Sequence, residues 1–132
     1  MKYIKRFENL EEPEIGDYVL LQVNRNFSND YKNFINNNIG EIVSIDKNTY
    51  TKARHFEIRY YIDTFEEFSK MKDSFRYISF DVENEEYYFS NLFNPDYVVE
   101  FGKTKEEVEL KIATKKYNLL NILKHLKIQD LH

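Results

Sequence analysis

The sequence contains no cysteine, no tryptophan, three glycines and two prolines among its 132 residues. Without cysteine, neither a disulfide framework nor a thiolate metal site can form. Three scattered glycines are too few for a loop that cradles a phosphate group. No apolar run approaches the roughly 20 residues of a membrane span, and the first residues lack the apolar stretch of a signal peptide. We therefore expect a cytoplasmic protein that does not cross a membrane.

Side chains suited to catalysis are also scarce. The only histidines are His55, His125 and His132, and no nucleophile, nucleotide-binding or metal-binding motif accompanies them. Acidic residues gather between positions 81 and 86, a pattern more typical of an exposed strand end than of a cation site. We therefore expect no enzymatic activity, no catalytic residue, no bound metal and no cofactor.

The residues that can build a core are mostly aromatic. The chain holds 11 Phe and 11 Tyr, and its length suffices for one modest core but not for two. We therefore predict a single domain over residues 1–132. Alternating apolar residues predict strands at Ile15–Val23, Ile39–Asp46, Arg54–Ile62, Phe75–Val82, Tyr87–Phe89 and Tyr97–Phe101.

Helical spacing predicts three further elements. Ser28 can cap a short helix within residues 27–38, and a second short helix falls within residues 63–73 with Phe65, Phe68 and Met71 turned inward. A longer helix over about 104–127 begins with a capping box, in which the Thr104 side chain accepts from the Glu107 amide and the Glu107 side chain accepts from the Thr104 amide. A break in this helix is expected near Asn118.

Two glycine motifs suggest a fold. Gly16-Asp17-Tyr18-Val19 opens the first predicted strand, and Gly40-Glu41-Ile42-Val43-Ser44-Ile45 forms the second. Together they resemble the KOW motif of SH3-like barrels, with a helical insert between the two halves. The resemblance implies an α+β chain: a small SH3-like antiparallel β-barrel or curled sheet over about 1–102, a helical insert and a C-terminal helix over about 104–127. Gly40 would lie where the chain bends or packs closely.

A second resemblance covers most of the chain. The segments Met1–Asn9, Ile15–Val19, Asn37–Ile45, Glu57–Tyr60 and Gly102–Glu109 resemble the corresponding segments of a group of small phage proteins. This resemblance implies a phage origin and hence a role in the cytoplasm of a host cell.

The charge distribution favours an interaction protein. The net charge is −4, with acidic residues concentrated between Glu83 and Glu109 and five lysines without an acid between Lys111 and Lys127. An acidic surface can occupy a basic nucleic-acid channel by mimicry. We therefore expect a protein that binds and inhibits or redirects a host protein or ribonucleoprotein, with CRISPR nuclease inhibitors as one class. The candidate partner-binding residues are Tyr61, Tyr77, Glu83, Glu85, Glu86 and Tyr87.

Two alternatives stay open. Ribosomal and transcriptional KOW proteins carry basic residues near the glycine loop, whereas this chain has Asn36, Asn37 and Asn38. An RNA-binding accessory module would therefore have to use other cations, and a virion structural component would reveal itself by oligomerising. The candidate nucleic-acid-binding residues are Arg54, Arg59, Arg76, Lys111, Lys115, Lys116 and Lys124, with Lys52 nearby.

Overall fold

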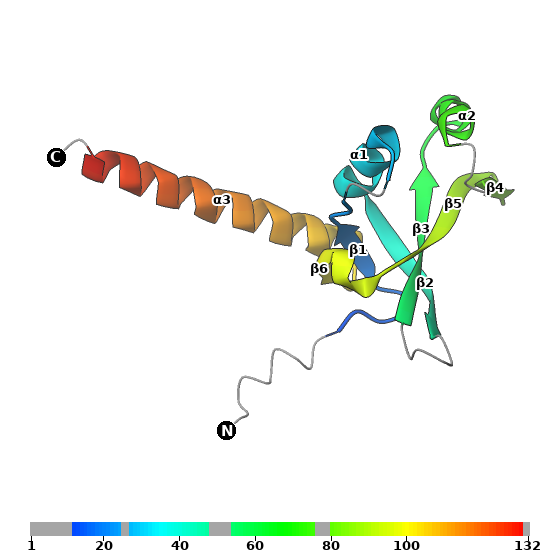
Figure 1. Ribbon diagram of the computed structural model, residues 1–132, viewed down its shortest axis with the longest axis horizontal. Helices are drawn as coiled ribbons and strands as arrows, with labels where there is room; N and C mark the ends of the chain where they lie inside the picture. Colours follow the sequence, from blue (N-terminus) through cyan, green and yellow to red (C-terminus); the bar gives the residue numbers. More distant parts are fainter. Residues whose placement is uncertain (1–11, 25–26, 48–53, 76–79, 131–132) are drawn as a thin grey trace, which may run out of the picture.

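The computed structural model describes residues 12–24, 27–47, 54–75 and 80–130, with side chains described as far as Leu126. A sheet forms the body, two short helices lie over it, and one long helix extends away from it (Figure 1). The elements are β1 Tyr18–Leu21, α1 Asn29–Asn37, β2 Ile39–Lys47, β3 Arg54–Ile62, α2 Phe65–Ser74, β4 Phe80–Glu83, β5 Glu86–Phe93, the 3₁₀ turn η2 Pro95–Tyr97, β6 Val98–Gly102 and α3 Lys105–Asp130.

The six strands form one antiparallel sheet in the order β4-β5-β3-β2-β1-β6. The last strand, β6, therefore pairs with the first, while β4 lies at the other edge. The α+β class, the helical insert and the C-terminal helix are confirmed. Of the two expected forms, a barrel or a curled sheet, the barrel is not formed, because within the described residues β4 and β6 do not pair with each other and the sheet stays open.

Gly40 lies where two strands and the core meet. It pairs with Val19 of β1, and a β-carbon at this position would lie 2.5 Å from Ile58 Cγ2 and 2.9 Å from the Tyr60 ring. Only glycine therefore fits without displacing these side chains, and the expected close packing is confirmed. Gly16 has another role, since its φ of 96° lies in the region that side chains disfavour.

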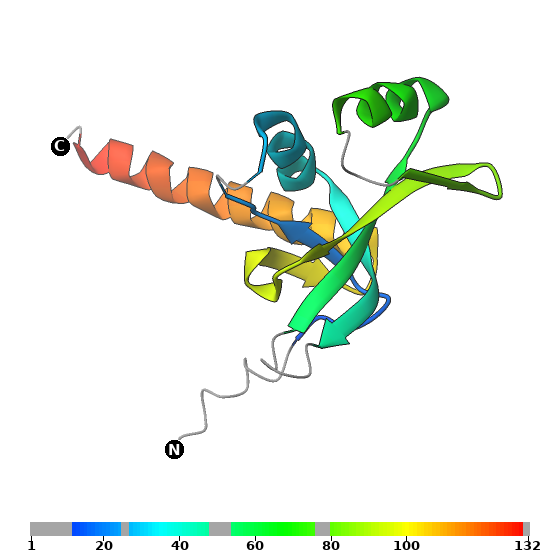
Figure 2. The same ribbon diagram turned by 45° about the vertical axis from the view of Figure 1, so that its right-hand side comes forward.

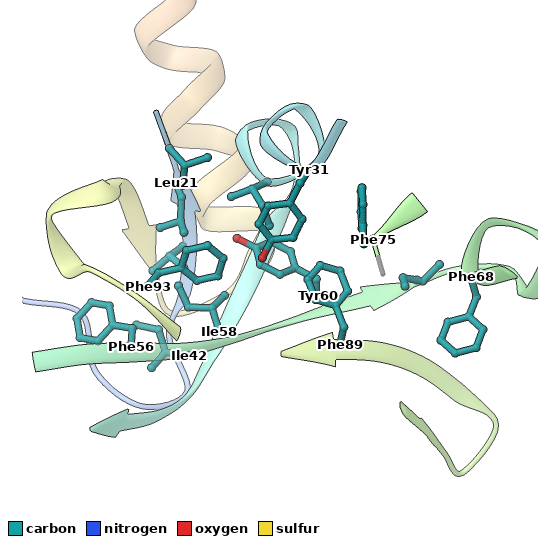
Figure 3. Packing of buried hydrophobic residues seen from close by; sticks show 14 residues of the cluster. Leu21, Tyr31, Ile42, Phe56, Ile58, Tyr60, Phe68, Phe75, Phe89 and Phe93 are labelled. Carbon is teal, nitrogen blue, oxygen red and sulfur yellow. The ribbon is translucent and has the colours of Figure 1, made fainter. Parts of the chain in front are cut away.

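Aromatic side chains fill the space between the sheet and α1 (Figure 3). Tyr31 of α1 makes an edge contact with Phe75 at 5.3 Å between ring centroids and stacks against Phe93 at 6.5 Å. From the sheet, Tyr60 stacks on Phe89 at 5.4 Å. The predicted cap holds α1 in place, because Ser28 Oγ accepts from the Tyr31 amide at 3.4 Å.

Helix α2 differs in part from the prediction. Phe68 is buried and Met71 packs on the core, as expected, but Phe65 is 63% exposed. The strand predicted to begin at Phe75 is also wrong at its start. Phe75 is the C-terminal cap of α2, and its amide donates to the Met71 carbonyl at 2.8 Å. Residues 76–79 of the predicted strand lie outside the described residues, and β4 covers Phe80–Glu83.

Helix α3 begins with a modified capping box. Thr104 Oγ1 accepts from the Glu107 amide at 3.0 Å, as predicted, but Glu107 Oε1 accepts from the amide of Lys103, not Thr104, at 2.9 Å. Val108 is fully buried against the sheet. The helix then runs to Asp130 without the break expected near Asn118, and it points away from the body (Figure 1).

Candidate interaction surfaces

The β4–β5 hairpin lies at the end of the sheet far from α3 (Figure 2). At this end, one face of the sheet carries a cluster of carboxylates beside a tyrosine. The strand register places Tyr61, Tyr88 and Asp81 side by side across β3, β5 and β4, and Glu83 opposite Glu86. Residues two apart on a strand share a face. Asp81, Glu83, Glu86 and Tyr61 are therefore on one face, and all four are exposed. We call this group the hairpin face.

Arg59 is the one cation that the described register places beside the hairpin face, and its guanidinium already contacts two neighbouring side chains of β5. Its guanidinium lies 4.2 Å from the centre of the Tyr88 ring, and its Nε donates to Ser90 Oγ at 3.4 Å. Arg59 thereby covers Tyr88, which is 9% exposed, whereas Tyr61 stays 44% exposed. Between residues 80 and 102 the chain has no lysine or arginine. The hairpin face therefore carries more negative than positive charge.

The turn between β4 and β5 holds two residues in the left-handed region. Asn84 has a φ of 52° and Glu85 a φ of 66°. A two-residue hairpin turn of this kind favours Asn followed by Gly, because glycine adopts positive φ without steric cost. Glu85 instead has a charged side chain there, and the like-charged pair Glu83 and Glu86 flanks the turn. The left-handed backbone at Glu85 and the repulsion between Glu83 and Glu86 both lower the stability of this end of the hairpin.

Tyr87 lies on the opposite face from Tyr61. Its ring packs 4.8 Å from Phe68 and 5.8 Å from the exposed Phe65. Val82 is opposite Tyr87 in the register and is 58% exposed. The structure therefore brings together Tyr61, Glu83 and Glu86, places Glu85 at the turn between the two faces, and separates Tyr87 from the others. Tyr77, Arg76 and Lys52 lie outside the described residues.

Sequence reasoning missed three residues at this end of the sheet. Helical spacing predicts that Phe65 turns inward, and no sequence pattern singles out Val82 or Tyr88 as part of this surface. The lack of a basic residue from 80 to 102 was the one signal that could have marked this edge as a continuous surface.

The basic candidates do not form one surface. Lys111 Nζ donates to the Phe101 carbonyl at 2.8 Å, and Lys115 Nζ pairs with Glu100 at 2.7 Å, so both turn toward the body. Arg54 pairs with Glu12 at 2.9 Å at the start of β3. Lys116 and Lys124 are exposed farther along α3.

A polar cluster fixes the start of α3. The Asp17 carboxylate is buried, accepts from the Glu14 amide at 2.9 Å and pairs with Lys103 Nζ at 3.0 Å. Hydrogen bonds to Asp17 and Glu14 raise the pKa of Lys103. The hydrogen bond from the Lys103 amide, followed by that from Lys111, lowers the pKa of Glu107. Because every group in this cluster has a partner within the chain, we assign it to anchoring α3.

Helix α3 exposes large apolar side chains from Leu110 onward. Each of the following is at least half exposed: Leu110, Tyr117, Leu119, Leu120, Ile122, Leu123 and Leu126. Large apolar side chains left uncovered in such number often mark an interaction site. This helix therefore forms a second candidate surface.

Neither surface resembles a metal centre. In the described ranges, no three or more His, Asp or Glu side chains come close enough to hold an ion. Over the same ranges, no helix is both long and apolar enough to span a bilayer. In the comparisons with known proteins, no protein-family model, curated protein or solved structure matches the chain.

Proposed function

We propose that this protein is a non-catalytic interaction protein that binds a basic surface of a host protein or ribonucleoprotein and inhibits or redirects it. The observation that carries the proposal is the hairpin face, where exposed Tyr61 lies beside Asp81, Glu83 and Glu86, and where the one cation that the described register places nearby, Arg59, contacts Tyr88 and Ser90. Tyrosine supplies contact area at low entropic cost, and carboxylates steer a basic partner. A CRISPR nuclease, whose nucleic-acid channel is basic, belongs to the class of partner that fits.

The strained turn supports the same function. A glycine at position 85 would relieve the backbone, and removing one of the paired glutamates would relieve their repulsion. A costly arrangement of this kind favours a binding role for the charges. Acidic residues also protect an open edge strand such as β4 from pairing with other sheets, so the experiment has to separate the two roles.

The resemblance to SH3-like barrels and to small phage proteins belongs to this proposal. The pairing of the first and last strands, β1 with β6, supports an opened relative of a small barrel. A phage origin would place the partner in the cytoplasm of a bacterial host.

The test reverses the charge of the hairpin face but keeps charged side chains on the edge strand β4, so that this strand stays protected from pairing with other sheets. Glu83→Lys with Glu86→Lys reverses the potential, while lysine guards an edge strand as well as glutamate does. The matched control, Asp46→Lys with Asp73→Lys, makes the same change in net charge at exposed positions elsewhere. We expect immobilised wild type and control to enrich the same protein from nuclease-treated bacterial lysate, and the hairpin variant to lose it.

Two results would contradict the proposal. Equal enrichment by the hairpin variant and the wild type would show that this face is not the contact. Loss of all enrichment after nuclease treatment would instead favour the RNA-binding alternative, since phosphate contacts would then hold the complex together.

A further inference from the structure

The face of α3 that points away from the sheet carries apolar side chains at heptad spacing. Leu110, Ala113, Tyr117 and Leu120 follow one another at intervals of three and four residues, and all are exposed. Successive residues of a helix are about 100° apart around its axis, so Leu110 lies about 160° around the helix from the buried Val108. The four side chains therefore lie on the side opposite Val108. A seam of this spacing is what paired helices bury. We call it the outer seam.

The outer seam has complementary ends. Glu106 precedes it by four residues and Lys124 follows it by four, so the same spacing continues through both charged side chains. Both are exposed. The helix therefore presents a negative end, an apolar middle and a positive end along one line.

We propose that the outer seam binds the outer seam of a second copy of this chain, with the two α3 helices antiparallel and the dyad at Lys115. This register sets Leu110 opposite Leu120 of the second copy, and the small Ala113 opposite the large Tyr117.

Charge complementarity selects the antiparallel orientation. In the proposed register Glu106 meets Lys124 of the second copy, so an ion pair forms at each end of the seam. A parallel pair would instead set Tyr117 against Tyr117 and Lys124 against Lys124.

The body leaves this arrangement room. In α3 up to Leu126, the side chains that are buried or half-buried are those of Glu107, Val108, Lys111 and Ile112. These lie on the side of the helix that faces the sheet, so the outer seam is open from Glu106 to Lys124. The overlap spans about 27 Å at 1.5 Å per residue. A contact of this length falls at the small end of stable interfaces, which places the expected Kd near the micromolar range.

We choose a second copy of this chain as the partner because the same helix carries both the acidic end and the basic end that pair across the antiparallel seam. A nucleic acid would need the lysines of α3 on the outer seam, but Lys111 and Lys115 turn toward the body. The proposal rests on α3 alone and is independent of the hairpin face. Exchanging Glu83 and Glu86 for lysine should therefore leave dimerisation unchanged.

Sedimentation equilibrium of the full chain, from about 1 to 500 µM, tests the dimer. We expect a monomer–dimer equilibrium that Leu120→Glu weakens at least about 30-fold, because it buries an unpaired charge in the seam. Leu126→Glu is the matched control, since Leu126 is equally large, 50% exposed and on the opposite side of the helix. Lys124→Glu should weaken the dimer, and combining it with Glu106→Lys should restore it.

Thiol cross-linking tests the orientation. The chain has no cysteine, so Leu110→Cys and Leu120→Cys each introduce the only thiol. We expect a disulfide-linked dimer when the two variants are mixed and little when either is oxidised alone, because like positions are about 15 Å apart in the antiparallel pair. A monomer at all concentrations, disruption by Leu126→Glu and not by Leu120→Glu, or efficient cross-linking of either variant alone would each overturn the proposal.

Discussion

Gly40→Ala tests the close packing of β2 against β3. The added β-carbon would lie 2.5 Å from Ile58 Cγ2 and 2.9 Å from two atoms of the Tyr60 ring, well inside ordinary contact distances. Ile58 and Tyr60 are at most 1% exposed, so neither can move into solvent. Overpacking of this kind costs about 1–3 kcal/mol. Replacing glycine by alanine also lowers the conformational entropy of the unfolded chain. This stabilises the folded state by about 0.4–1 kcal/mol and so offsets part of the packing cost.

The expected net loss is therefore about 1–2 kcal/mol in the free energy of unfolding. For a chain of this size it corresponds to a fall in Tm of roughly 3–10 °C. Urea unfolding followed by circular dichroism measures the first quantity, and a thermal scan measures the second.

A double-mutant cycle identifies the clash as the cause. Ile58→Leu removes the branch that carries Cγ2, so it should cost less in the Gly40→Ala background than in the wild type, with a coupling of at least about 0.5 kcal/mol. An unchanged Tm for Gly40→Ala, or additive costs in the cycle, would refute the packing argument.

Three further predictions concern single side chains. Tyr60 Oη is buried with no hydrogen-bond partner among the described residues, so Tyr60→Phe should raise the free energy of unfolding by about 1 kcal/mol in urea titrations; a loss would mean that the hydroxyl is satisfied. Glu85→Gly should raise Tm by a few degrees, since relief of a left-handed residue is worth about 1 kcal/mol; an unchanged or lower Tm would contradict the cost assigned to the turn. Glu107 has a pKa below its ordinary 4.5, so its stabilising contribution is present above that pH and is lost as the pH falls through the folded-state pKa. The difference in unfolding free energy between wild type and Glu107→Gln should therefore shrink from neutral pH toward pH 3, and a difference that does not depend on pH would argue against the assigned bonds.

Local signals predicted most of the secondary structure. Phe56, Ile58, Tyr60 and Ile62 alternate strictly, and they form the buried face of β3 over the predicted bounds. Ser28 marked the start of α1 because its cap is formed by residues three apart in the chain. Where the deciding contact is local, a sequence pattern suffices.

Long-range contacts decided what the sequence could not predict. Alternation from Phe75 to Val82 suggested one strand, but Phe75 ends α2 and packs on Tyr31. In the run Tyr87-Tyr88-Phe89 the alternation does not say which tyrosine faces outward, and the register with Tyr61 settles it. Whether the sheet closes depends on the relative positions of β4 and β6, which no local pattern encodes.

The candidate site was partly predictable for the same reason. The acidic residues around the hairpin could be identified from composition, and three of the six partner-binding candidates, Tyr61, Glu83 and Glu86, lie on one face. On α3, helical spacing predicted the helix but also suggested a break near Asn118 that is not formed. Spacing alone does not distinguish an apolar side chain that packs on its own sheet, such as Val108, from one left exposed, such as Leu120.

Hydrogen exchange of the full chain, alone and saturated with the lysate component that it enriches, tests the central claim most directly. Because a bound partner excludes water from the contact, we predict slower amide exchange in β4, in the turn at Asn84 and Glu85, and in β5, with rates in β2 unchanged. Unchanged exchange throughout the hairpin, or protection confined to α3, would contradict the assignment of the hairpin face as the partner-binding surface.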